Sequence, residues 1–259
     1  MGDNPVAGRG VVVTGAAGAI GLAIATRLAH EGARVVVADV RPELDAVAAG
    51  IEAHAVVGDA ASEAGVTALV AEARRHLGDI DIWFANAGVD RGSVLAASDD
   101  DWAATLDVNV MAHVRAARLL VPDWLDRGEG RFVVTASAAG LLTMLGSATY
   151  SVSKHAAVAF AEWLSATYRH RGVVVQAICP QGVRTRMLEQ AGVLQDLLSH
   201  DRALAPDEVA DAVWEALADD RFLVLPHPEV AGYYAARATD TDRWLGAMNR
   251  LQQRLEVTA

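Results

Sequence analysis

Short runs of β-branched and apolar residues alternate along the chain with longer segments that favour helices. The first run, Val11 to Val13, leads into a glycine-rich turn and then into a helix-compatible segment at 19–30. Strands that are apolar on both faces must be covered on both sides, and parallel strands need a helix to return the chain. The pattern therefore predicts one doubly wound α/β domain, in which helices flank both faces of a seven-stranded parallel sheet. We expect the six further strands at 34–38, 54–57, 80–85, 131–135, 173–178 and 221–225.

Neither an internal repeat nor a linker interrupts this alternation, so residues 1–259 are expected to form one domain. Two regions break the rhythm. The segment 184–205 is long for a strand-to-helix connection and is a candidate substrate lid. In the C-terminal extension, 227–259, apolar side chains recur at helical spacing. This tail is expected to cap the domain or to contact another subunit, and a direct role at the substrate is the alternative. The recurring side chains are Trp244, Met248, Leu251 and Leu255.

The charge balance limits the partners of the chain. It has 22 Lys and Arg residues against 33 Asp and Glu residues, a formal charge of −11 at pH 7. Such a surface repels phosphate backbones and anionic lipid, so neither a nucleic acid nor a membrane is expected as a partner. The one uncharged stretch of membrane-like length, 10–26, contains four glycines, which favour a turn over a spanning helix.

The single cysteine, Cys179, cannot form an internal disulfide, and its apolar surroundings in the sequence favour a buried side chain over a nucleophile. The first residues show no pattern of export or myristoylation, so a cytoplasmic location is expected. The eight histidines lack metal-ligand spacing, and no metal is expected. We interpret His155, His170 and His200 as surface or helix-end groups.

The glycine-rich turn after the first strand is typical of a dinucleotide site. Gly15, Gly18 and Gly21 let the backbone approach a pyrophosphate, and the helix that follows directs N–H groups at that charge. Asp39 ends the second strand 18 residues beyond Gly21, where its carboxylate can bond the adenosine ribose and repel the extra phosphate of NADP. NAD is therefore predicted in preference to NADP, for which Arg41 is the nearby basic candidate. The alternative for Asp39 is a plain turn acid at a strand end.

Tyr150 and Lys154 stand four residues apart, which places both side chains on one face of a helix. An adjacent ammonium and a bound nicotinamide cation would stabilise the phenolate and lower the pKa of the phenol, so that Tyr150 can exchange a proton with an alcohol. The same spacing is also common on exposed helices. Ser137 favours the catalytic interpretation, because it follows a predicted strand and strand ends line the ligand crevice of such sheets.

In the order and spacing of its motifs the chain resembles the common, single-domain type of short-chain dehydrogenase/reductase, over nearly its whole length. The motifs are the turn 14–21, Asp39, Asp59, Asn86-Ala87-Gly88, Trp102, Val108-Asn109, Ser137, Tyr150, Lys154 and the run 180–185. The resemblance implies a Rossmann-like fold that binds NAD.

The resemblance also implies a role for each matching residue. Tyr150 would be the general acid/base, Ser137 would polarise the substrate oxygen, and Lys154 would hold the nicotinamide ribose and lower the pKa of Tyr150. Asn109 would hold a water that relays the proton. The cofactor would be bound by Gly15, Gly18, Ile20, Gly21, Asp39, Asp59 (at the adenine), Asn86, Gly88, Tyr150, Lys154, Pro180, Val183 and Thr185. The substrate would meet Ser137, Leu141, Met144, Tyr150, Gln181, Met187 and Leu188.

Three positions depart from the family pattern. Ala19 stands where the middle glycine is usual, with Gly18 one place earlier, which is expected to alter the pyrophosphate turn slightly. Ala85 replaces the first Asn of Asn-Asn-Ala-Gly and costs a structural hydrogen bond but no catalytic group. Gln181 replaces a glycine after Pro180, and its amide is either a feature of the substrate pocket or part of the loop alone.

Together these residues favour an NAD-dependent enzyme that interconverts a secondary alcohol and a ketone, with oxidation as the favoured direction. The apolar residues expected near the site favour a hydroxy-lipid, a steroid-like or an aryl alcohol over a free sugar. The family implies a homo-oligomer, a tetramer or a dimer, associated through the helices at 101–125 and 150–171. The competing hypothesis is a non-catalytic nucleotide-binding or regulatory protein on the same fold.

Overall fold

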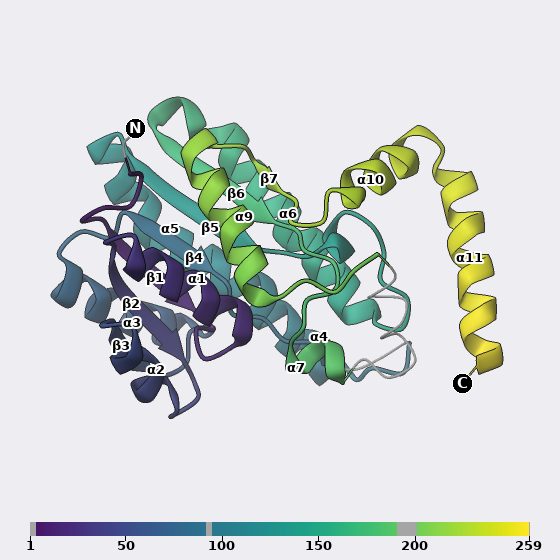
Figure 1. Cartoon of the computed structure of the whole chain (residues 1–259), viewed down its shortest axis with the longest axis horizontal. Coiled ribbons are helices and arrows are strands. Elements are labelled where there is room, and N and C mark those ends of the chain that lie inside the picture. Colours follow the sequence, from purple (N-terminus) through teal and green to yellow (C-terminus); the bar gives the residue numbers. More distant parts are fainter. Residues whose placement is uncertain (1–3, 92–94, 191–200, 259) are drawn as a thin grey trace.

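The computed structural model describes residues 4–91, 95–190 and 201–258. Within these residues seven strands, all parallel, form one sheet in the order β3-β2-β1-β4-β5-β6-β7 (Figure 1). The doubly wound, Rossmann-like fold predicted from the sequence is confirmed, because strand order reverses between β1 and β4. The strands are β1 Gly10–Thr14, β2 Arg34–Asp39, β3 His54–Val57, β4 Ile82–Ala85, β5 Gly130–Thr135, β6 Val173–Ile178 and β7 Leu223–Val224.

Two strands are shorter than the sequence pattern predicts. β4 starts two residues later than position 80. The carbonyl oxygen of Ile80 instead accepts hydrogen bonds from the indole N–H of Trp124 at 2.7 Å and from Arg127 at 3.2 Å. β7 keeps only two residues of the predicted 221–225 and lies at the edge of the sheet. Neither change moves the carboxyl ends of the central strands.

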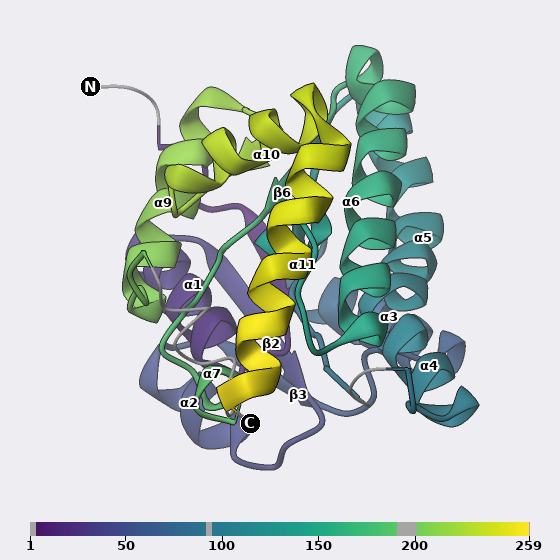
Figure 2. The ribbon, with the colours of Figure 1, turned by 90° about the vertical axis from the view of Figure 1, so that its right-hand side faces the viewer.

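Helices cover both faces of the sheet, as strands that are apolar on both sides require. In β1, Val12 packs into the core that contains residues of α3, α5 and α6, whereas Val11 and Val13 pack into the core with α1 and α9. Figure 2 shows these two helical layers on opposite sides of the sheet. The helices that make the layers and their connections are α1 Ala19–His30, α2 Leu44–Gly50, α3 Glu63–Leu77, α4 Asp99–Leu106, α5 Ala112–Arg127, α6 Ala148–Tyr168, α7 Arg186–Glu189 and α9 Pro206–Asp219, with shorter turns η1 Asp107–Met111, η2 Ala138–Gly140 and η3 Arg169–Arg171.

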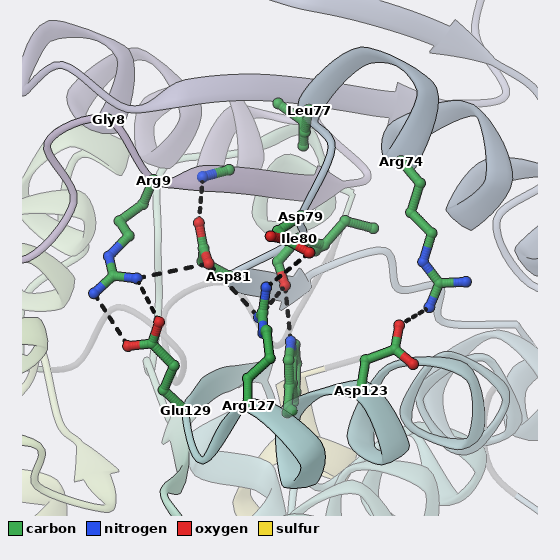
Figure 3. Close-up of polar contacts among 12 residues, drawn as sticks. Gly8, Arg9, Arg74, Leu77, Asp79, Ile80, Asp81, Asp123, Arg127 and Glu129 are labelled. Carbon is green, nitrogen blue, oxygen red and sulfur yellow. Dashed lines mark hydrogen bonds and ion pairs between the residues drawn. The ribbon is translucent and has the colours of Figure 1, made fainter.

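A network of ion pairs joins the amino-terminal ends of β1, β4 and β5 (Figure 3). Asp81, just before β4, accepts a hydrogen bond from the backbone N–H of Gly10 at 2.7 Å and lies 3.6 Å from Arg127. Arg9 donates two hydrogen bonds to the carboxylate of Glu129, just before β5, at 3.0 and 3.2 Å. The network thus occupies the edge of the sheet opposite the carboxyl ends, where the residues with predicted chemistry lie.

The C-terminal extension consists of α10 Glu229–Thr239 and α11 Thr241–Thr258. α11 projects away from the body of the domain (Figure 1), and it runs across the front of the domain in the view of Figure 2. The two helices meet where the guanidinium carbon of Arg237 lies 5.3 Å from the centre of the Trp244 ring, and Leu245 is 52% exposed. α10 packs on the domain through Val230, which is fully buried in the core. The expected roles of the tail as a cap of the domain or as a contact with another subunit stay predictions.

Two findings bear on the remaining expectations from composition. None of the helices in the described part of the chain has the length and apolarity to cross a bilayer. Cys179 is buried at the end of β6, and burial raises the pKa of its thiol to about 12. The thiol therefore stays protonated, and the interpretation of Cys179 as a small buried side chain is confirmed.

Candidate active site

The glycine-rich turn after β1 lies so close to its neighbours that Gly15 and Gly21 leave no space for a side chain. Gly15 has a φ of +65°, and a Cβ there would lie 2.8 Å from the Cα of Ala87. A Cβ on Gly21 would lie 2.5 Å from the carbonyl oxygen of Gly15, so α1 packs onto the turn at a distance that only glycine permits. Asn86 Nδ2 donates to the carbonyl oxygen of Thr14 at 2.9 Å and holds the turn against the end of β4.

The first turn of α1 is suited to an anion. Gly18 is the N-cap residue and makes no side-chain capping bond, and the first turn contains no acidic residue. The N–H groups of this turn and the helix dipole therefore favour a negative charge. A pyrophosphate fits this arrangement, and Gly15, Gly18, Ile20 and Gly21 are the residues that would hold it.

Asp39, at the end of β2, directs its carboxylate at the same turn. Oδ2 of Asp39 accepts from the N–H of Ala17 at 3.0 Å, and the guanidinium of Arg41 donates to both carboxylate oxygens at 3.0 Å. Burial by itself raises the pKa of Asp39, but the hydrogen bonds and charge of Arg41 outweigh burial, so the pKa lies below its usual value. A Cβ on Gly18 would lie 3.5 Å from Arg41 Nη2. The acid that is expected to disfavour an extra phosphate and the base that would attract it are thus paired with each other.

Asp59 shapes the turn that leads into α3. Its Oδ1 accepts from the backbone N–H groups of Ala61 at 2.7 Å and of Ser62 at 3.3 Å. The side-chain hydrogen bond of Ser62 is the main cause that lowers the pKa of Asp59. The expected contact between Asp59 and an adenine stays a prediction.

β5 and α6 bring Ser137, Tyr150 and Lys154 together. Ser137 follows β5, and the other two lie on α6, whose N-cap residue Ser147 accepts a hydrogen bond from the N–H of Tyr150 at 3.3 Å. Lys154 Nζ donates to the carbonyl oxygen of Thr135 at 2.8 Å and lies 5.5 Å from the centre of the Tyr150 ring. The side chain of Ser137 hydrogen-bonds with that of Tyr150. The predicted placement of Tyr150 and Lys154 on one helix face is confirmed.

Burial dominates the protonation of this group. It raises the pKa of Tyr150 to about 12, against the opposing effect of the Ser137 hydrogen bond, and it lowers the pKa of Lys154 to about 8. The expected lowering of the Tyr150 pKa is thus wrong for the chain by itself, because desolvation of the phenolate outweighs the stabilisation from its neighbours. The nicotinamide cation, which that expectation also invoked, would act in the opposite direction from burial.

Asn109 is fully buried in η1, a π-helical turn between α4 and α5. Its Oδ1 accepts from the N–H of Val89 at 2.9 Å, and its Nδ2 donates to the Val89 carbonyl at 2.8 Å and to Ser153 Oγ at 2.9 Å. A Cβ on Gly88 would meet Asn109 Oδ1 and Lys154 Nζ, both at 3.3 Å. Gly88, Asn109 and Lys154 therefore adjoin one another, and the Asn109 amide joins the loop after β4 to α6.

The loop after β6 reaches the same region. The carbonyl oxygen of Pro180 accepts from the N–H of Ala138, next to Ser137, at 2.8 Å. The N–H of Gln181 donates at 3.1 Å to Nδ1 of His227, which is 2% exposed. Gln181 Oε1 is buried and has no hydrogen-bond partner among the described residues. A buried acceptor without a donor is costly, which favours a ligand contact over a loop role for Gln181.

The candidate lid, 184–205, is described only in part, because 191–200 lies outside the described residues. Val183 pairs with Leu204 in a parallel bridge, so the two ends of this segment lie side by side. Thr185 is the N-cap residue of α7 and accepts from the N–H of Leu188 at 3.4 Å.

The residues expected to meet the substrate differ in exposure. Met187 is 45% exposed and Met144 is half-buried in the loop before α6. Leu188 and Leu141 are only 7% and 2% exposed, and Leu141 packs in the core beside α6. The side chain of Leu141 thus belongs to the core, which leaves it little surface for the expected substrate contact.

Two polar residues that hold the site were not singled out as site residues from the sequence. Thr14 Oγ1 accepts from the N–H groups of Asn86 and Ala87 at 3.0 and 3.1 Å. Asp90 accepts from Ser147 Oγ at 2.6 Å, and burial raises the pKa of Asp90. Thr14 is the last residue of β1, and its place at the carboxyl edge of the sheet could have identified it as a site residue. The sequence spacing around Asp90 contains no such indication.

The histidines make no metal site in the described part of the chain, where no group of three or more His, Cys, Asp or Glu side chains could hold an ion. His170 is exposed in η3, and His200 lies outside the described residues. His155 is not a simple surface group, because it is half-buried and its ring lies 2.8 Å from the carbonyl oxygen of Ser151 and 3.0 Å from Arg237.

The fold and this site define a nucleotide-binding α/β oxidoreductase. Residues 9–193 match the family model described as short chain dehydrogenase. The 1-deoxy-11-beta-hydroxypentalenate dehydrogenase of Streptomyces avermitilis is 40% identical over 228 residues, which are 84% of this chain and 84% of that protein. Oxidoreductase UcpA of Escherichia coli is 35% identical over 189 residues, 70% of this chain and 72% of that protein.

Solved structures agree with this assignment. A short chain dehydrogenase/reductase from Burkholderia phymatum in complex with NAD has a TM-score of 0.83 at 30% identity, with 92% of this chain and 95% of that chain covered. A short chain dehydrogenase from Burkholderia cenocepacia in complex with NADP has a TM-score of 0.77 at 30% identity, with 86% and 96% covered. The chain belongs to the short-chain dehydrogenase/reductase family.

Proposed function

We propose that this protein transfers a hydride between NAD(H) and a secondary alcohol or ketone with an apolar carbon skeleton. The observation that carries the proposal is the meeting of Tyr150, Lys154 and Ser137 near the carboxyl end of β5, with the anion-binding turn at the end of β1. A phenol, an ammonium and a hydroxyl in contact are the groups that proton exchange with an alcohol oxygen needs.

A bound nicotinamide dinucleotide supplies the hydride acceptor or donor. The Tyr150 phenolate takes the proton of the alcohol in oxidation, and the protonated phenol returns it in reduction, while Ser137 Oγ hydrogen-bonds with the substrate oxygen. Lys154, held by its bond to the carbonyl oxygen of Thr135, keeps an ammonium near the ring of Tyr150. Asn109 maintains the contact between η1 and α6 on which this arrangement depends.

The preference for NAD is supported by the ionised carboxylate of Asp39 at the end of β2. It can accept hydrogen bonds from ribose hydroxyls, and it repels a 2′-phosphate. The related solved structures hold NAD in one case and NADP in another, so the preference depends on this chain's own residues.

Asp39→Ala is expected to reduce the ratio of kcat/KM with NAD to that with NADP by roughly 10- to 100-fold. The change removes the repulsion of the phosphate and releases Arg41, whose guanidinium can then pair with it. Steady-state kinetics with both cofactors measures the ratio. Asp45→Ala, an exposed acid in the first turn of α2, is the matched control and should leave the ratio unchanged. An undiminished preference in Asp39→Ala would remove Asp39 from the selectivity argument.

The substrate class is supported by exposed Met187 and half-buried Met144, which present apolar surface near the site. The Streptomyces relatives are dehydrogenases of 1-deoxy-11-beta-hydroxypentalenate, a hydroxylated carboxylate. We infer an alcohol of comparable size on an apolar skeleton for this protein, with oxidation as the favoured direction.

A kinetic screen tests the proposal. Purified protein is mixed with NAD or NADP and a panel of secondary alcohols that runs from butan-2-ol to bicyclic and steroid-like alcohols, and absorbance reports reduction of the cofactor. Turnover with NAD that improves with apolar size is the expected result. The proposal would be contradicted if the protein binds NAD but neither oxidises any alcohol with NAD nor reduces any ketone with NADH. That result would favour the non-catalytic alternative.

We also propose a homo-oligomer that associates through α5 and α6. On α6, Val152 and Trp163 are 49% and 55% exposed, and their spacing of 11 residues places both on one face of the helix, which an interface would bury. Light scattering at micromolar concentration distinguishes a tetramer or dimer from a monomer, and a monomer would contradict the proposal.

A further inference from the structure

Arg237 of α10 reaches the part of the chain that carries the predicted catalytic residues. Its Nη1 donates to the carbonyl oxygen of Leu141 and, at 3.0 Å, to Nε2 of His155. These partners precede Arg237 by 96 and 82 residues in the sequence. Leu141 follows the turn that begins at Ser137, and His155 is the next residue after Lys154 on α6. One guanidinium group therefore joins the C-terminal extension to the segment after Ser137 and to α6.

The hydrogen bonds around His155 specify one form of the imidazole. Nδ1 lies 2.8 Å from the carbonyl oxygen of Ser151, which can only accept, so Nδ1 carries the proton. Nε2 is then the acceptor for Arg237, whose guanidinium can only donate. On the side of α11 the Trp244 ring lies 5.3 Å from the guanidinium carbon, which favours the cation. The Arg237 side chain is thus held by partners from three segments, namely Leu141 after η2, His155 of α6 and Trp244 of α11.

The loop 141–147 connects the turn that begins at Ser137 to α6, the helix that carries Tyr150. Ser147 ends the loop and accepts the N–H of Tyr150. Arg237 holds the beginning of the loop through the Leu141 carbonyl. A shift at that end is therefore transmitted to the start of α6.

The same loop contains a residue predicted to meet the substrate. The backbone N–H and carbonyl oxygen of Met144 both bond Ser151 Oγ at 3.0 Å, so the loop lies against α6 in its middle as well. Met144 and His155 also line an open groove of about 520 Å³. Arg237 thus contacts both the beginning of the loop that lines this groove and a side chain on the groove itself.

We propose that Arg237 is a positioning residue through which the C-terminal extension holds the 141–147 loop and determines how well bulky alcohols bind. The inference rests on the proposed function. On this proposal α10 contributes to substrate specificity. His155 contributes as the hydrogen-bond acceptor that holds Arg237 in place.

The test compares Arg237→Ala, Arg237→Lys and the exposed-arginine control Arg250→Ala on α11. For a bicyclic secondary alcohol, Arg237→Ala is expected to raise KM about tenfold, the effect of losing charged hydrogen bonds of ordinary strength, while the Kd for NAD stays within about twofold. Arg237→Lys should restore part of the loss, because an ammonium can still donate to one of the two acceptors. Arg250→Ala should behave as the wild type. Hydrogen–deuterium exchange should increase at 142–147 in Arg237→Ala alone.

Two outcomes would overturn the inference. One is a parallel loss of alcohol binding and NAD binding in Arg237→Ala, which indicates general loosening of the fold. The other is unchanged exchange at 142–147. His155→Phe, which removes the acceptor but keeps the ring, provides a second route, and its effect on KM should not add to that of Arg237→Ala. The exchange measurement needs no turnover, so it decides the inference even where the wild type oxidises no alcohol and the proposed function itself fails.

Discussion

Tyr150→Phe is expected to lower kcat for alcohol oxidation by about a thousandfold, within the range usual for loss of a general acid/base. The ring fills the same space, so the packing of α6 should persist and the Kd for NAD should change by less than about twofold. In the wild type, oxidation should accelerate as pH rises above neutral, because burial raises the pKa of Tyr150 and the phenol has to lose its proton. Stopped-flow and steady-state assays of NADH formation measure both effects.

The control for this substitution lies on the same helix. Tyr168→Phe removes a hydroxyl from the far end of α6 and keeps the edge-on contact of the ring with Trp163, 5.9 Å between ring centres. It should leave kcat unchanged. Turnover in Tyr150→Phe equal to that of the wild type would exclude Tyr150 as the acid/base and with it the chemistry proposed for the site.

Acid is expected to destabilise the protein through His113. This residue of α5 is 2% exposed, and neither ring nitrogen has a hydrogen-bond partner among the described residues. Burial, and to a smaller extent the charge of Lys154, lowers the pKa of His113 to about 3. An unfolded histidine has its usual pKa of 6.5, so the unfolded chain binds the extra proton between pH 6.5 and 3. Stability from this group is present above pH 6.5 and is lost as pH falls towards 3, by roughly 3 kcal/mol at pH 4.

His113→Phe should flatten this part of the pH dependence. The aromatic ring retains most of the volume, and no proton is taken up on unfolding. Urea unfolding at a series of pH values between 4 and 7 gives the free energies, and the exposed His170→Phe is the matched control that should follow the wild type. Identical slopes for His113→Phe and the wild type would show that another group controls acid unfolding.

The sequence predicted most of the fold because strand and helix signals here are local. Val11 to Val13 are β-branched and followed by a glycine turn, and the structure places β1 and α1 there. The same applies to the shared helix face of Tyr150 and Lys154, which follows from spacing alone. Strand ends were less predictable where side chains far along the chain compete for backbone groups, as Trp124 does at Ile80.

The properties of the site that depend on burial and on distant contacts could not be predicted. The pKa of Tyr150 moves up because the phenol is desolvated, and no sequence pattern reports the depth of a side chain. The Arg41 guanidinium forms an ion pair with the Asp39 carboxylate. Whether two residues of opposite charge meet in this way depends on the conformation of the turn between them. The contact of Arg237 with His155 spans 82 residues, and the direction of α11 follows from a junction that helical spacing does not describe.

The two margins of the sheet are short. β3 contributes four residues at one margin and β7 two at the other, and every longer strand has neighbours on both sides. A margin with few unpaired backbone groups offers little template for adding a foreign strand, which is the usual first step of fibril growth. A concentrated stock of this protein should therefore resist β-type self-assembly for as long as the sheet stays intact.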